Sequence, residues 1–155
     1  MQRVVINKSQ NDANMQGPVY RIDIKVPAQL VDGNGHVNNV AYVRWMQDAA
    51  VDHSNATGCT EASSALGATW VVRAHRIEYL RPAFAGDIII VLTWVANFRK
   101  VHSLRKYKFI RQADSVLLAE AETDWVFVNA KSGRPMAIPD SIKNAFQIVC
   151  RGNEP

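Results

Sequence analysis

Residues 31–42 read VDGNGHVNNVAY, a polar stretch that runs directly into an apolar one. Asp32, a histidine and three asparagines surround two glycines within it. Asp, Asn and Gly are typical of short turns, because they tolerate left-handed backbone and hydrogen-bond to their own main chain. Local composition therefore favours a plain turn. The alternative is that the same turn also holds a reaction centre.

The segment before this turn has the alternation of a strand with one buried face. In residues 19–27, VYRIDIKVP, the side chains of Tyr20, Ile22, Ile24 and Val26 occupy every second position. Polar residues fill most of the positions between them. A period of two predicts a half-buried strand that leads into the turn.

The segment after the turn has helical spacing. Val43, Met46 and Ala50 follow one another at three or four residues, and Gly58 is a suitable C-terminal stop. Polar residues are few between Asn39 and this glycine. Apolar surface then covers most of the circumference, which predicts a largely buried helix.

Four further strand-like stretches follow, at residues 69–80, 87–97, 102–111 and 115–129. Hairpin-length connections join them, so the predicted sheet is mainly antiparallel. Residues 140–149, DSIKNAFQIV, combine an N-cap with an apolar stripe and predict a terminal helix. This order of elements predicts an α+β fold in which the sheet wraps around the first helix.

Residues 87–95, DIIIVLTWV, are apolar on both faces of their predicted strand. One sheet covered by one helix leaves the second apolar face in water, whereas a second copy of the chain would cover it. We therefore expect a homodimer or a homotetramer.

The chain has 155 residues, which is the length of one domain with a substantial core. We expect a single domain over residues 19–150, after a flexible N-terminal tail at residues 1–18. No apolar run approaches the ~20 residues of a membrane span, and the first residues do not resemble a secretory signal. The expectation is a cytoplasmic protein with no membrane partner.

Much of the net charge of +4 lies in residues 98–111, FRKVHSLRKYKFIR. Three interpretations are open: a solvated hairpin edge, a patch for a small phosphorylated ligand, or a nucleic-acid site. No nucleic-acid motif accompanies the patch, so we expect no nucleic-acid partner. As a phosphate patch, it offers the side chains of Arg99, Lys100, Arg105 and Lys106.

The motifs of this chain resemble those of hotdog-fold thioesterases, in the group similar to 4-hydroxybenzoyl-CoA and acyl-acyl-carrier-protein (acyl-ACP) thioesterases. The first motif is D-x-N-x-H-V-N-N-x-x-Y, from Asp32 to Tyr42. Supporting matches are Arg44-Trp45, IEYLRPAFAGD at 77–87 and the segment SGRP…IP at 132–139. The resemblance implies a five-stranded antiparallel sheet wrapped around one long central helix, with a C-terminal helix in this chain. It also implies edge-to-edge dimers with active sites at the subunit interface, and acyl thioester hydrolysis without a metal or cofactor.

The resemblance implies catalytic roles for residues of the first motif. Asp32 would act as the general base or as the nucleophile, and its alternative role is to cap its own loop. The helix start at Asn38 and Asn39 would polarise the thioester carbonyl, or one of these residues would simply cap the helix. His36 would orient Asp32 or water, or pass a proton to the thiol, and otherwise makes structural hydrogen bonds. Asn34 matches plant-type acyl-ACP thioesterases, although the further acidic or cysteine residue of those enzymes has no visible counterpart.

Three aromatic residues, Tyr42, Trp45 and Trp70, are either core residues or walls of an acyl pocket. Two other functions remain open. An enoyl-CoA hydratase of the same fold would have its histidine five residues after the aspartate, whereas His36 follows Asp32 by four. A non-catalytic acyl-thioester binding module is the second alternative. A calcium loop is disfavoured, because His36 and Val37 occupy positions that require an oxygen ligand and a glycine.

Overall fold

The computed structural model describes residues 14–155. Its elements are β1 (Met15–Gln16), β2 (Val19–Lys25), the short 3-10 helix η1 (Ala28–Leu30), α2 (Asn39–Ala56), α3 (Cys59–Ala65), β3 (Ala68–Tyr79), β4 (Ile88–Arg99), β5 (His102–Arg111), β6 (Leu117–Asn129) and α4 (Asp140–Lys143). The strands form one six-stranded sheet in the order β1-β2-β4-β5-β6-β3, and every neighbouring pair is antiparallel.

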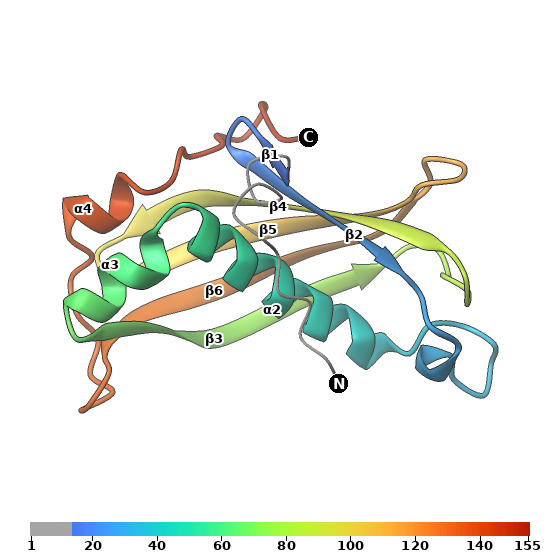
Figure 1. The fold of residues 1–155 in the computed structure, drawn as a ribbon, viewed down its shortest axis with the longest axis horizontal. Helices are drawn as coiled ribbons and strands as arrows, with labels where there is room; N and C mark the ends of the chain where they lie inside the picture. Colours follow the sequence, from blue (N-terminus) through green and yellow to red (C-terminus); the bar gives the residue numbers. More distant parts are fainter. Residues whose placement is uncertain (1–13) are drawn as a thin grey trace.

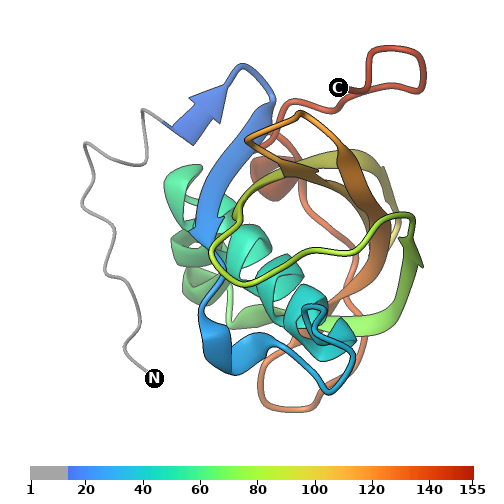
Figure 2. The same cartoon turned by 90° about the vertical axis from the view of Figure 1, so that its right-hand side faces the viewer.

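The sheet curves around α2, which lies along its concave side (Figures 1 and 2). The predicted α+β hotdog fold is confirmed, with its five long strands in the expected places. The sixth strand is the two-residue β1, which pairs with β2 and lies inside the segment expected to be a flexible tail. The rest of that expectation, at residues 1–13, lies outside the described residues.

One face of α2 packs into the core, and the other is exposed in the single chain. Its buried positions follow one helical stripe: Ala41, Tyr42, Trp45, Met46, Ala49, Ala50 and His53. Arg44, Gln47 and Asp48 lie on the exposed face, and Val51 there is 36% exposed. The expectation of a largely buried helix is therefore met on one face only in the single chain, because the sheet covers one side of α2.

The terminal helix is much shorter than predicted. α4 ends at Lys143, although Ile142 and Val149 of the predicted apolar stripe are buried. The N–H of Val149 donates to the carbonyl of Val95 at 3.0 Å. This segment leaves the helix because its main chain and apolar side chains bind to the sheet instead.

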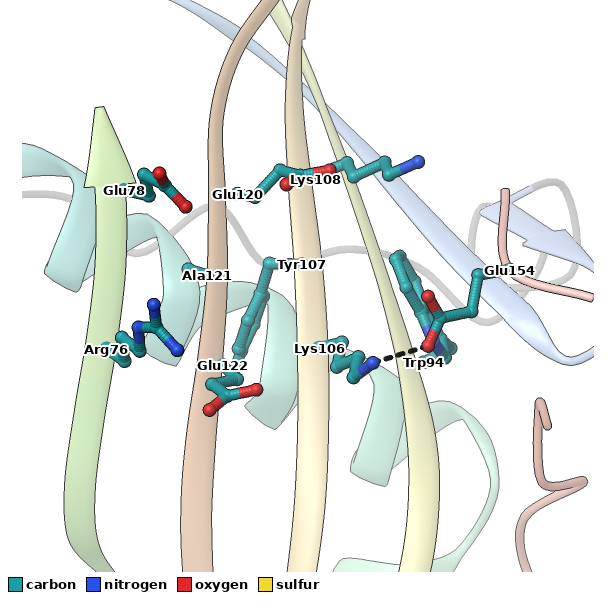
Figure 3. A pocket seen from close by; sticks show the side chains of 10 residues that line it. All are labelled: Arg76, Glu78, Trp94, Lys106, Tyr107, Lys108, Glu120, Ala121, Glu122 and Glu154. Carbon is teal, nitrogen blue, oxygen red and sulfur yellow. Dashed lines mark hydrogen bonds and ion pairs between the residues drawn. The ribbon is translucent and has the colours of Figure 1, made fainter. Parts of the chain in front are cut away.

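The same C-terminal segment explains part of the apolar outer face of β4. Trp94 lies on this face beside Lys106 and Glu154 (Figure 3), and it is only 1% exposed. The Lys106 ammonium and the Glu154 carboxylate form an ion pair at 2.6 Å across it. A second copy of the chain is therefore not needed to cover Trp94, and the predicted oligomer stays a prediction.

Arg105 is buried inside the fold instead of lying at the surface for phosphates. Its guanidinium Nη1 donates to His53 Nδ1 at 2.8 Å and to Thr93 Oγ1 at 3.2 Å. The His53 ring stacks on Tyr20 with centroids 5.2 Å apart, and it meets Phe146 edge-on. Arg105 thus joins the C-terminal half of α2 to β4 and β5.

The prediction that Arg105 binds substrate is corrected. The side chains of Arg105 and Tyr107 point into the fold, whereas those of Lys106 and Lys108 point outward.

No helix among residues 14–155 is long and apolar enough to cross a membrane.

The buried His53 predicts a dependence of stability on pH. Burial, aided by the nearby Arg105 charge, lowers the pKa of His53 from 6.5 to about 2. Below pH 6.5 the unfolded chain binds a proton on this ring and the folded chain does not. The free energy of unfolding therefore decreases as the pH falls from 6.5, by up to about 1.4 kcal/mol per pH unit from this group.

This prediction is tested by urea unfolding at several pH values between about 7.5 and 5, the range that brackets an unperturbed histidine pKa. His53→Gln keeps an acceptor for Arg105 and removes the titrating ring. We expect the variant to lose less stability than the wild type over this range. Equal losses in the two proteins would contradict a neutral, buried His53.

Candidate active site

The 31–38 loop is a tight turn held together by hydrogen bonds to Asp32. The Asp32 carboxylate oxygen Oδ1 accepts hydrogen bonds from the main-chain N–H groups of Asn34 at 2.9 Å and His36 at 3.3 Å. The main chain of Asp32 also bonds to His36 and to Gly35, whose φ of 77° suits a glycine. The turn interpretation of this loop is therefore correct. Asp32 nevertheless keeps its Oδ2 without a protein partner among the described residues.

The loop leads directly into the first turn of α2. Asn38 is the N-cap, and its side chain accepts from the N–H of Val40 at 3.0 Å. The N–H of Ala41 donates to the Asn38 carbonyl at 2.9 Å. The N–H of Asn39 has no partner within residues 14–155. An exposed amide thus remains at the positive end of an 18-residue helix.

The 80–87 connection packs against this loop and fixes its position. The N–H of Val37 donates to the carbonyl of Ala83 at 2.8 Å. The Phe84 ring meets the His36 ring edge-on with centroids 5.5 Å apart. Arg111 secures the connection by donating to the Pro82 carbonyl at 3.1 Å and to the Asp87 carboxylate at 3.3 Å. The motif at 77–87 therefore places Phe84 beside the polar turn.

Exposed apolar side chains gather around the helix start. Val40 is 71% exposed and Phe84 is 43% exposed. Tyr79 and Leu80, at the end of β3, are also exposed. None of these four was singled out from the sequence alone. The sequence could have indicated three of them, because Tyr79, Leu80 and Phe84 all lie inside the 77–87 motif.

The other predicted site residues separate into two groups. Tyr42 and Trp45 are buried in the main core directly behind the helix start, with Tyr42 against Phe109.

Trp70 packs on Phe127 near the beginning of β3. Arg99 is the last residue of β4, and Lys100 follows it in the exposed β4–β5 turn. The Lys100 carbonyl accepts a hydrogen bond from the N–H of Ile138 at 2.8 Å, close to α4. In Figure 1 this end of the sheet lies opposite the 31–38 loop.

A hollow of about 180 Å³ opens on the outer face of the sheet (Figure 3). Its rim is charged, and the strand register places Arg76, Glu122 and Lys106 side by side in one row. This face points away from α2. We therefore do not assign the candidate active site to this hollow.

A sequence profile described as the thioesterase-like superfamily matches residues 26–146, which is most of the chain. The chain belongs to this superfamily. The match begins just before the loop and ends after α4, so it includes every element that builds the candidate site.

Named relatives agree with this membership. The acyl-CoA thioester hydrolase YbgC of Escherichia coli is 29% identical over 136 residues, covering 86% of this chain and 99% of YbgC. A palmitoyl-acyl carrier protein thioesterase from chloroplasts of Cuphea hookeriana is 24% identical over 140 residues. That match covers 84% of this chain and 33% of the plant enzyme, so the chain spans about a third of it.

Among solved structures, YbaW from E. coli, a probable thioesterase, superposes with a TM-score of 0.75 at 20% identity. The superposition covers 81% of this chain and 94% of YbaW. This likeness concerns the fold. Together with the superfamily match, it confirms the resemblance to hotdog thioesterases that the motifs indicate.

The N-cap predicts a specific effect on stability. Asn38→Ala removes the acceptor for the Val40 amide, so we expect a loss of about 1 kcal/mol in the free energy of unfolding. Urea unfolding measures this loss. Asn39→Ala is the matched control, because the exposed Asn39 side chain forms no cap, and its effect should stay within about 0.5 kcal/mol. Equal effects of the two substitutions would contradict the cap assignment.

Proposed function

We propose that this protein hydrolyses acyl thioesters of coenzyme A or of acyl carrier protein to a free carboxylic acid and a thiol. One observation carries the proposal. A single turn presents a carboxylate with one unpaired oxygen, on Asp32, next to a helix whose first amide, on Asn39, has no partner among the described residues. Hydrolysis of a thioester needs a base or nucleophile and a donor for the carbonyl oxygen.

The Asn39 amide supplies the donor in this mechanism. The thioester carbonyl oxygen accepts a hydrogen bond from this N–H at the positive end of α2. Negative charge develops on the oxygen as the carbonyl carbon is attacked, so the interaction strengthens in the transition state. Asn38 keeps the helix start ordered by capping Val40.

Asp32 supplies the base or the nucleophile. Its Oδ1 is held by the amides of Asn34 and His36, which leaves Oδ2 to take a proton from water or to attack the carbonyl carbon. The first route gives the acid directly, and the second passes through a mixed anhydride that water then opens. In both routes the C–S bond breaks and the sulfur takes up a proton, for which His36 is the nearby donor.

The exposed apolar residues support an acyl substrate. Val40 and Phe84 flank the proposed reaction centre, and in the single chain Val40 is mostly exposed and Phe84 is partly exposed. Apolar surface of this kind gains free energy when a hydrocarbon chain or aromatic acyl group covers it.

We also propose that two copies pair through β3. This strand has 12 residues and, within residues 14–155, pairs with β6 alone, and long unpaired edges favour the addition of another strand. In an antiparallel pair, the Trp70 end of one β3 faces the Tyr79 end of the other. The Asp32 loop of one copy would then lie near Trp70, Arg99 and Lys100 of the other copy. In this arrangement the side chains of Arg99 and Lys100 are available to bind the phosphates of the substrate.

The mechanism predicts that Asp32→Asn lowers kcat/KM by about 100-fold or more, because the substitution keeps the shape and removes the base. Thiol release is followed for acetyl-, hexanoyl-, palmitoyl- and benzoyl-CoA and for the same acyl groups on carrier protein. Asp48→Asn is the matched control, since Asp48 lies on the exposed face of α2. Equal rates for wild type and Asp32→Asn would remove Asp32 from the mechanism. Tight binding without release from any substrate would favour a binding module.

The pairing through β3 predicts that Val71→Lys converts dimers to monomers and abolishes most activity, because lysine on an edge discourages strand pairing. Sedimentation velocity measures the oligomer. Ile148→Lys is the control, since Ile148 is 41% exposed and Val71 is 43% exposed. A Val71→Lys variant that remains dimeric would place the interface elsewhere.

A further inference from the structure

We propose that Tyr79 is a positioning residue that holds the first turn of α2 for the thioester carbonyl. This inference rests on the proposed function and adds a residue to it. The Tyr79 hydroxyl donates a hydrogen bond to the main-chain carbonyl of Asn39 at 3.1 Å. Asn39 is the residue whose N–H is the proposed donor to the substrate.

Asn39 is held from two directions. On the N-terminal side, the N–H of Asn38 donates to the Leu30 carbonyl at 2.7 Å, and the Asn38 side chain caps the turn. These contacts come from the loop and the helix themselves. Within residues 14–155, the Tyr79 hydroxyl is the side-chain donor to this turn from another element, the edge strand β3.

The Tyr79 ring is itself well placed to act as an anchor. It meets the buried Tyr42 ring at a centroid distance of 5.2 Å and an interplanar angle of 84°. Tyr42 in turn packs on Phe109 in the main core. The hydroxyl is therefore connected to a rigid part of the molecule through two aromatic contacts. Burial also raises the pKa of Tyr79, so the hydroxyl keeps its proton at neutral pH.

The first turn needs such an anchor for its chemistry. Helix ends fray, and residues 38–40 are all exposed in the single chain. An amide that stabilises developing charge must point at the position of the oxygen before the reaction begins. An anchor on the Asn39 carbonyl restricts the peptide groups on both sides of that residue. Its loss should therefore affect the transition state more than the bound substrate.

Tyr79→Phe tests the hydroxyl while it keeps the ring contacts. Because one neutral hydrogen bond is involved, we expect kcat to fall about three- to tenfold with KM little changed. Binding of a non-hydrolysable thioether analogue of the substrate should be unchanged. Tyr107→Phe is the matched control, since it removes a buried hydroxyl from β5 and should retain the wild-type kcat. An unchanged kcat in Tyr79→Phe, or a change confined to KM, would overturn the inference.

Hydrogen exchange tests the anchor without any substrate. In Tyr79→Phe we expect faster exchange at the hydrogen-bonded amides of Val40 and Ala41, while the C-terminal half of α2 exchanges as in the wild type. Unchanged exchange at both amides would overturn the anchoring. Absence of thiol release from the wild-type protein would instead overturn the proposed function and Tyr79's part in it, whatever the exchange result.

Discussion

The packing of one face of α2 against the curved sheet is the constraint on which the rest of the structure depends. A helix satisfies its main chain internally except at its ends. Residues such as Met46 and Ala49 are fully buried, which fixes the helix axis along the sheet. The N-terminal end therefore emerges at one end of the sheet, where the 31–38 loop meets it. The position of the core and the position of the candidate site follow from the same packing.

Local patterns predicted what local interactions determine. The turn at Asp32, the start of α2 at Asn39 and the long strands depend on spacing within short segments, and all were found where expected. Contacts between distant segments were not predictable in this way. Arg105 reads as one more cation in a basic run, yet its partner His53 is 52 residues away. The early end of α4 likewise depends on Val95, far along the chain from Val149.

The sequence predicted which residues belong to the candidate site, but it did not predict that they lie at two separate ends of the sheet in one chain. Asp32 and Asn39 lie together because the sequence places them in one turn. Trp70 lies near the start of β3, and Arg99 and Lys100 lie where β4 meets the β4–β5 turn. This end of the sheet is opposite the turn in Figure 1, so a single chain does not bring these residues to it. The resemblance to hotdog thioesterases implies active sites between subunits. Residues that act on opposite sides of an interface are expected to be far apart in one copy, and β3 connects the two ends.

The two interpretations of the Asp32 loop do not exclude each other. A carboxylate has two oxygens, and the turn uses Oδ1 alone to bind the amides of Asn34 and His36. Those two bonds orient the side chain, and a fixed orientation is what a general base or nucleophile requires. A structural role for one oxygen thus prepares the other for chemistry. The same holds for the helix start, where Asn38 caps the Val40 amide and thereby leaves the neighbouring Asn39 amide ordered and available.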